Sequence, residues 1–244
     1  MTAFRTLWMA LVGLYEETLV LVAANVAAFV LNLALGLVIV LVGLLFPTVQ
    51  DDVARQWLIG IVLWMLLYLP TPGNVALGGL AQVAAGPDAP RFAAFRDALR
   101  VYWRQALRCT AASVVITLAL VWNIWFYFNV GTGWLQLVSI LWLYVTLFWI
   151  SLHIYVVPLL LHIAEPRIFD VYRRAAFVAL GHAGYTIVLL IAILVIGAVS
   201  VVFLPVYVLV AGAYISLIQA HALREIRRRH GDLVAEADEE VSRL

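Results

Sequence analysis

Lysine is absent from this chain of 244 residues, and all fifteen of its basic side chains are arginine. Charged residues of both signs make up only 12% of the sequence, whereas soluble domains carry about 25%. Too few charges are therefore present to cover a surface that faces water. This shortage excludes a water-soluble domain and a disordered chain.

Residues that usually carry chemistry are also scarce. The single cysteine, Cys109, excludes an internal disulfide and a site built from several thiolates. His153 and His162 lie nine positions apart, on nearly opposite faces of one predicted helix, so we expect packed or interfacial side chains rather than metal ligands. The sequence has no P-loop, no G-x-S-x-G motif and no H-E-x-x-H motif. We therefore predict no catalytic residue, no cofactor and no metal, and an intramembrane enzyme is the least favoured class.

Acidic residues are missing from the interior of every long apolar segment. Carriers that are coupled to protons or sodium ions usually need a carboxylate within the membrane. Ion-coupled transport is therefore disfavoured as well.

What the chain has in abundance is apolar sequence: 66% of its residues are hydrophobic and its mean hydropathy is +1.04. A helix needs roughly 20 apolar residues to cross a membrane. The last apolar block, 182–222, is long enough for two helices, and we expect the turn between them at 197–200. Six spans are predicted, at residues 18–46, 57–85, 106–128, 134–163, 182–199 and 201–222. The first span is too long for the core of a cleavable signal peptide, so we expect none.

The arginines predict the orientation. With six spans, fourteen of the fifteen arginines fall on the side that holds both termini, and only Arg55 falls on the other side. Arginine-rich connections remain in the cytoplasm, so both termini are expected there. The outer connections are too short to form a receptor domain, so function is expected within the membrane or on its cytoplasmic face.

Three amphipathic segments, 4–14, 92–108 and 168–180, each precede a pair of spans. The second segment carries an arginine at every fourth position, namely Arg96, Arg100, Arg104 and Arg108. Such a helix is expected to lie in the interface with its apolar side toward the lipid. With Arg173 and Arg174 of the third segment, these arginines form either a topology anchor or a face that binds lipid or a cytoplasmic partner.

Polar residues inside the spans have two interpretations each. Asn25 and Asn32 share one face of the first span, where they could make interhelical contacts or bind a polar ligand. Residues 70–74 (PTPGN) interrupt the second span, with Thr71 as the N-cap and Pro72 as the first residue of a half-helix. The half-helix start, including Gly73 and Asn74, could be a binding site, as in transporters with discontinuous helices, or only a kink.

Small residues form a further stripe on the last span, at Gly212, Ser216 and Ala220. Such a stripe indicates a close helix contact. The contact could lie within the chain or between two copies of it.

Several short motifs together resemble a known family. They are the asparagines at 25 and 32, residues 70–77 (PTPGNVAL), Phe95-Arg96, residues 155–160 (YVVPLL) and residues 168–175 (IFDVYRRA). Over most of residues 1–225 the chain resembles the YesL-like family of bacterial integral membrane proteins, whose function is not established. The family's second helix usually breaks at a Pro-Ala-Thr type sequence, from which Pro72-Gly73-Asn74 departs. The resemblance implies a bacterial plasma membrane and an accessory role beside a carbohydrate-uptake system, and it offers no catalytic residue.

The sequence thus predicts an all-α, polytopic membrane bundle of six transmembrane helices with cytoplasmic interfacial amphipathic helices. One transmembrane domain, 1–225, is followed by a charged cytoplasmic tail, 226–244. The expected function is that of a non-enzymatic accessory or scaffold subunit, and the alternative is a small-solute or lipid carrier with a cavity at the broken second span. The expected partners are the lipid bilayer and either another membrane protein or a second copy of the chain, and not nucleic acid.

Overall fold

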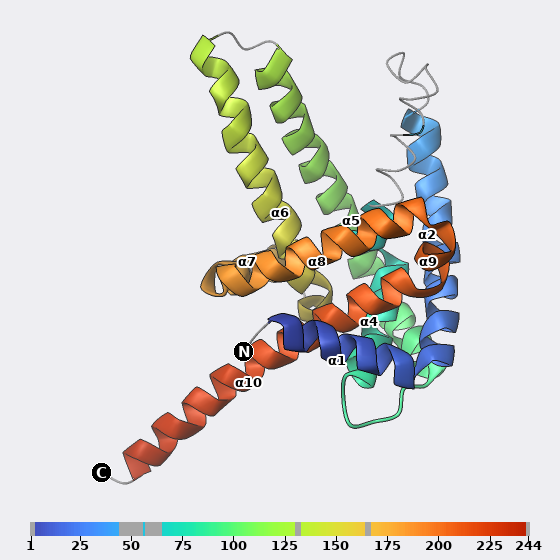
Figure 1. The fold of residues 1–244 in the computed structure, drawn as a ribbon, viewed down its shortest axis with the longest axis vertical. Coiled ribbons are helices and arrows are strands. Elements are labelled where there is room, and N and C mark those ends of the chain that lie inside the picture. Colours follow the sequence, from blue (N-terminus) through green and yellow to red (C-terminus); the bar gives the residue numbers. More distant parts are fainter. Residues whose placement is uncertain (1–2, 44–55, 57–64, 130–132, 164–166, 243–244) are drawn as a thin grey trace.

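A computed structural model describes residues 3–43, 56, 65–129, 133–163 and 167–242 of the chain (Figure 1). Every regular element within these ranges is helical and none is a strand, which confirms the predicted all-α class. The elements are α1 (Ala3–Glu16), α2 (Thr18–Gly43), α4 (Pro72–Ala84), α5 (Phe92–Asn129), η2 (Gly133–Gln136), α6 (Leu137–His162), α7 (Ile168–Gly181), α8 (Ala183–Val202), α9 (Leu204–Val206), η3 (Tyr207–Ala211) and α10 (Gly212–Ser242).

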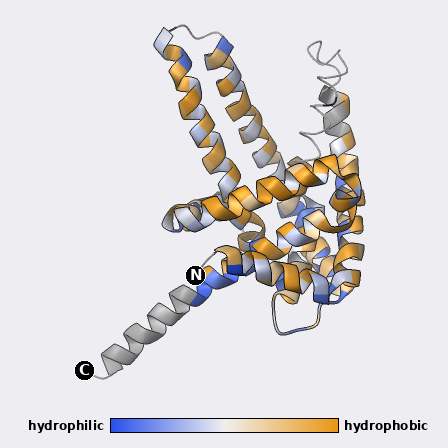
Figure 2. Ribbon diagram, in the orientation of Figure 1, coloured by the Kyte–Doolittle hydropathy of each residue, from blue (hydrophilic) through white to orange (hydrophobic). Residues whose placement is uncertain are grey.

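Five described segments are long and apolar enough to cross a membrane: Thr18–Leu37, Phe92–Asn129, Gly133–His162, Ala183–Val202 and Leu204–Arg228. They confirm a multi-pass membrane protein. Figure 2 shows hydrophobic residues along α8 and along the paired helices α5 and α6. The first part of the remaining predicted span, 57–64, lies outside the described residues.

α4 and the first half of α10 form the centre of the bundle. Two thirds (67%) of the apolar window in Leu204–Arg228 is buried, against 22–33% in the other four spans. α4 packs against α2, α5, α6 and α10. Thus the half-helix that follows the break in the second span is enclosed by protein on most sides.

The segment 92–108, expected to lie in the interface, is instead the first part of α5 and continues directly into the third span. No glycine or proline occurs between Phe92 and Asn129, so nothing in the sequence stops the helix. Its apolar arc packs against protein: Phe95 and Ala106 are buried, and α5 contacts α4 along this face.

The expected turn at 197–200 is wrong. α8 continues through these residues to Val202, with Gly197 and Ser200 buried inside the helix. The chain turns at Phe203, which has non-helical backbone angles (φ −108°, ψ 81°), and Pro205 lies in the short helix α9 that follows. Proline ends helices because it lacks an N–H, whereas glycine and serine are tolerated where helices pack closely in membranes.

Two shorter helices lie against the outside of the bundle. α1 buries one side, including Thr6 and Ala10, and exposes large apolar side chains, including Trp8, on the other. The hydroxyl groups of Thr6 and Tyr185 are 2.7 Å apart, which ties α1 to α8. α7 likewise buries one side, at Val171, and exposes another.

Candidate functional site

The break in the second span is built as the sequence predicted. Thr71 is the N-cap of α4, and its Oγ1 accepts a hydrogen bond from the backbone N–H of Asn74 at 3.2 Å. Pro72 follows as the first helical residue. A hydroxyl N-cap satisfies one of the free N–H groups that begin any helix.

Asn74 repairs the hydrogen-bond ladder that the prolines interrupt. Pro70 has no N–H with which to reach the carbonyl of Leu66, four residues earlier. The Nδ2 of Asn74 donates to that carbonyl and to the carbonyl of Leu69, both at 2.7 Å. The carbonyl of Pro70 accepts from Thr110 Oγ1 on α5 at 3.0 Å. The break is therefore satisfied within the protein.

Asn32 connects α2 to this break. Its Nδ2 donates to Asn74 Oδ1 at 3.0 Å. Its own Oδ1 has no hydrogen-bond partner in the described part of the chain and faces Gly73, where a Cβ would stand 2.6 Å from that oxygen and 2.7 Å from the Ala28 carbonyl oxygen. Only glycine allows such a close approach of α2 to α4.

Asn25, two helical turns earlier on α2, contacts a different irregular segment. Its Nδ2 donates to the carbonyls of Tyr207 at 3.1 Å and Val208 at 2.7 Å, which lie in the π-helical turn η3. Gly212, at the start of α10, packs against the Asn25 side chain. Ser216 and Ala220 are both buried. The small-residue stripe at Gly212, Ser216 and Ala220 is therefore a helix contact within the chain.

Of the six residues predicted around the break, the structure thus brings five together, and Asn25 stands apart. The side chains of Asn25, Asn32 and Asn74 are 3%, 5% and 8% exposed. They make interhelical or ladder contacts, which is one of the two interpretations open from the sequence.

A second polar cluster, which the sequence did not predict, joins α5, α6 and α7. His153 Nε2 and Ser113 Oγ are 3.0 Å apart, and Ser113 Oγ and the Tyr172 hydroxyl are 2.5 Å apart. His153 Nδ1 lies 2.9 Å from the Trp149 carbonyl oxygen. A carbonyl can only accept, so Nδ1 carries the proton and Nε2 accepts from Ser113 in the neutral imidazole.

A serine that donates to an oriented imidazole has the arrangement of an activated nucleophile. Here, however, Ser113 is fully buried and His153 is 2% exposed. Tyr172 lies against Ser113 and stacks on Trp149, with ring centroids 5.1 Å apart. No substrate carbonyl could reach the serine in this arrangement, so the cluster holds three helices together.

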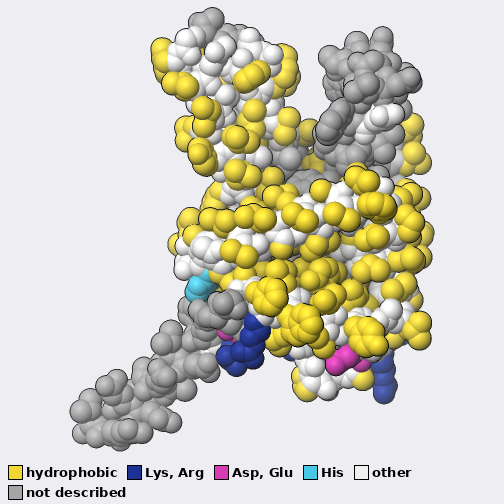
Figure 3. Space-filling view, viewed as in Figure 1, with side chains coloured by type: hydrophobic (Ala, Val, Ile, Leu, Met, Phe, Trp, Pro, Cys, Tyr) yellow, Lys and Arg dark blue, Asp and Glu magenta, His cyan; other side chains and the backbone are white. Residues whose placement is uncertain are grey.

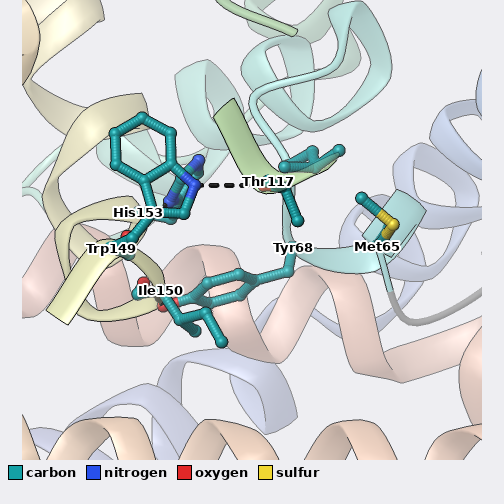
Figure 4. A pocket seen from close by; sticks show the side chains of 7 residues that line it. Met65, Tyr68, Thr117, Trp149, Ile150 and His153 are labelled. Carbon is teal, nitrogen blue, oxygen red and sulfur yellow. Dashed lines mark hydrogen bonds between the residues drawn. The ribbon is translucent and has the colours of Figure 1, made fainter. Parts of the chain in front are cut away.

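A small cavity lies beside this cluster (Figure 4). It has a volume of about 40 Å³ and is lined by Met65, Tyr68, Leu69, Thr117, Trp149, Ile150 and His153. The Trp149 indole N–H donates to Thr117 Oγ1 at 3.0 Å along one side of it. This volume has room for a few water molecules.

The predicted arginine face lies on the surface of α5. Arg96, Arg100, Arg104 and Arg108 are all exposed. Arg96 lies 3.8 Å from the neighbouring Asp97, and Arg104 lies over the Trp103 ring at 5.3 Å. Arg173 and Arg174 are exposed on α7. On the face drawn in Figure 3, basic side chains gather at one end of the molecule, and hydrophobic side chains cover most of the rest.

The far end of α4 is held by a further arginine. The Arg224 guanidinium donates to the carbonyls of Gln82 and Ala85, in the last turn of α4. Cations at this position satisfy free carbonyls and favour the negative end of the helix dipole. Both ends of α4 are thus capped by side chains.

No protein-family model, no curated protein and no solved structure matches this chain. The resemblance to the YesL-like family therefore remains a prediction that rests on the sequence motifs alone.

Proposed function

We propose that the chain is a non-enzymatic accessory or scaffold subunit of an assembly in the bacterial plasma membrane, with both termini in the cytoplasm. One observation carries the proposal. Apart from Asn32 Oδ1, the polar side chains of the broken span and of the cluster around His153 bind one another or the backbone, whereas the arginines of α5 are exposed. Within the described residues, no acidic side chain pairs with Arg100, Arg104 or Arg108.

The spacing of these arginines suits an acidic partner. Arg96 and Arg108 are twelve positions apart on one uninterrupted helix, which corresponds to about 18 Å. The helix that carries these arginines is held in place, because α5 packs against α4. A row of exposed guanidinium groups on a fixed helix can pair with carboxylates of a cytoplasmic domain or segment.

The orientation is supported by the arginine distribution, and the solute-uptake assembly is supported only by the resemblance to the YesL-like family. If the chain is such a subunit, it should be recovered from its native membrane with a partner in fixed stoichiometry. The tagged chain is extracted in a mild detergent for this test, and the bound proteins are identified and quantified.

Charge reversal tests whether α5 makes the contact. The triple variant R96E/R100E/R104E should insert normally and lose the partner. The matched control R5E/R91E/R167E changes the same charge on exposed side chains of the same predicted membrane side, all outside α5, and should keep the partner. Recovery of a folded chain without a partner, or equal loss in both variants, would refute the proposal.

The alternative, a small-solute or lipid carrier, requires water to reach the broken span. It is tested by the variants N25C, N32C and N74C in a C109A background, labelled with a membrane-impermeant maleimide. The burial of all three asparagines favours no labelling. Rapid labelling at two of the three positions would favour the carrier over the subunit.

A further inference from the structure

A pocket lies where α6 ends. It is separate from the broken span and from the cluster around His153, and of its lining residues only His162 and Arg174 have been discussed above. This open pocket is bordered by the last turns of α6, the middle of α7 and the middle of α10, and its volume is about 420 Å³. The lining consists of Leu159, His162, Ile163, Arg174, Val178, Leu223, Ile226 and Arg227. This volume falls in the range of about 300–1,000 Å³ that is typical of small-molecule sites.

The lining divides into two chemistries. Five of its eight side chains are aliphatic, and those of Leu223 and Ile226 are only 3% and 6% exposed. Arg174 from α7 and Arg227 from α10 are both exposed, and no carboxylate occurs among the described lining residues. Two arginines, with no carboxylate among the described lining residues, stand beside an aliphatic floor, and this combination suits a ligand with an anionic head and an apolar body.

The position of the pocket along the spans restricts the class of ligand further. The apolar segment that includes α6 ends at Ile163, and that of α10 ends at Ala222, beyond which Arg224, Glu225 and Arg227 follow. Both His162 and Arg227 are therefore at a boundary between the apolar segment and the polar end of the molecule, which is the depth at which lipid headgroups lie. An anion that is free in water would have no use for the aliphatic floor.

We infer that this pocket binds one anionic phospholipid. The phosphate group is held between Arg174 and Arg227, and the first part of an acyl chain lies on the floor formed by Leu159, Val178 and Leu223. The site does not depend on the subunit proposal, because it lies on α6, α7 and α10 rather than on the arginine face of α5.

The test uses the purified full chain and native mass spectrometry with added phosphatidylglycerol or phosphatidylcholine. One molecule of phosphatidylglycerol should remain bound, and phosphatidylcholine should bind weakly or not at all. The variant R174Q/R227Q should bind phosphatidylglycerol roughly 30-fold more weakly, since each arginine near an anionic headgroup contributes a factor of about 5.

Two further variants make the result specific. R100Q/R104Q removes the same charge from the exposed face of α5 and should bind the lipid as the original chain does. V178W fills the pocket without changing its charge and should also abolish binding, and circular dichroism checks that each variant is folded.

Three outcomes would overturn the inference. Equal weakening by R174Q/R227Q and R100Q/R104Q would mean that the lipid responds only to net charge. Unchanged binding by V178W would place the lipid elsewhere. Full displacement of phosphatidylglycerol by millimolar inorganic phosphate would indicate a site for the free anion.

Discussion

Replacement of Gly73 by alanine tests how tightly α2 and α4 are joined at the break. A Cβ there would stand 2.6 Å from Asn32 Oδ1 and 2.7 Å from the Ala28 carbonyl oxygen. A carbon and an oxygen in favourable contact are about 3.3–3.6 Å apart. The two helices would have to separate by at least about 0.6 Å, because the Ala28 oxygen belongs to the backbone and cannot rotate away.

The expected cost follows from these contacts. Overpacking of a close-packed interior costs about 1–3 kcal/mol, and a weakened Asn32–Asn74 hydrogen bond adds about 0.6 kcal/mol, the average for membrane proteins. The gain in helix propensity from glycine to alanine is at most about 1 kcal/mol. We therefore expect G73A to lower the free energy of unfolding by about 1–3 kcal/mol.

The measurement is equilibrium unfolding in mixed micelles with increasing dodecyl sulfate, followed by circular dichroism. G181A is the control, because a Cβ at Gly181 meets nothing within 4 Å, so this variant should be neutral or slightly more stable. The double variant N32A/G73A should be less destabilised than the sum of the single variants, because the Asn32 oxygen is gone while the Ala28 oxygen remains. If G73A is as stable as G181A, the close approach of α2 to α4 is refuted.

Two other side chains give predictions that the same unfolding assay can check. T71A removes the N-cap of α4 and should lower the free energy of unfolding by about 1 kcal/mol. The control T146A removes a hydroxyl that is bonded only to its own helix, at the Trp142 carbonyl, and should lower it by less. Equal losses in the two variants would contradict the role of Thr71 as a cap. Y172F should lower the free energy of unfolding by about 0.6–1.7 kcal/mol, because the phenol hydroxyl contacts Ser113 and the Cys109 carbonyl. An unchanged midpoint of the unfolding transition would show that the cluster does not hold α7 in place.

Features that depend on local chemistry could be predicted from the sequence. Two prolines on either side of a threonine determine where the second span stops and where α4 begins, because proline removes a donor and a hydroxyl replaces one. The structure has the break at the predicted residues, with Thr71 as the cap. The amphipathic segments 4–14 and 168–180 are helices for the same reason: their apolar spacing follows the helical period.

Features that depend on tertiary contacts could not be predicted in this way. The cluster of Ser113, His153 and Tyr172 draws on three helices, and no spacing in the sequence links position 113 to positions 153 and 172. The turn after α8 lies at Phe203, next to Pro205, and not at the predicted residues 197–200, which are helical. Small residues are common where helices pack closely in membranes, whereas Pro205 has no N–H and lies in the short helix α9 that follows the turn at Phe203.

The asparagines show why polar residues in a membrane protein do not by themselves mark a binding site. In lipid, a carbonyl that loses its N–H partner to proline finds no water to replace it. Asn74 supplies the donor that Pro70 lacks, and Asn25 donates to carbonyls of the π-helical turn that follows Pro205. An amide side chain near each irregular segment is therefore explained by the backbone before any ligand is considered. This explanation leaves one buried oxygen, Asn32 Oδ1, without a partner, and it does not account for the exposed arginines of α5 and α7, where a partner or a lipid should be sought.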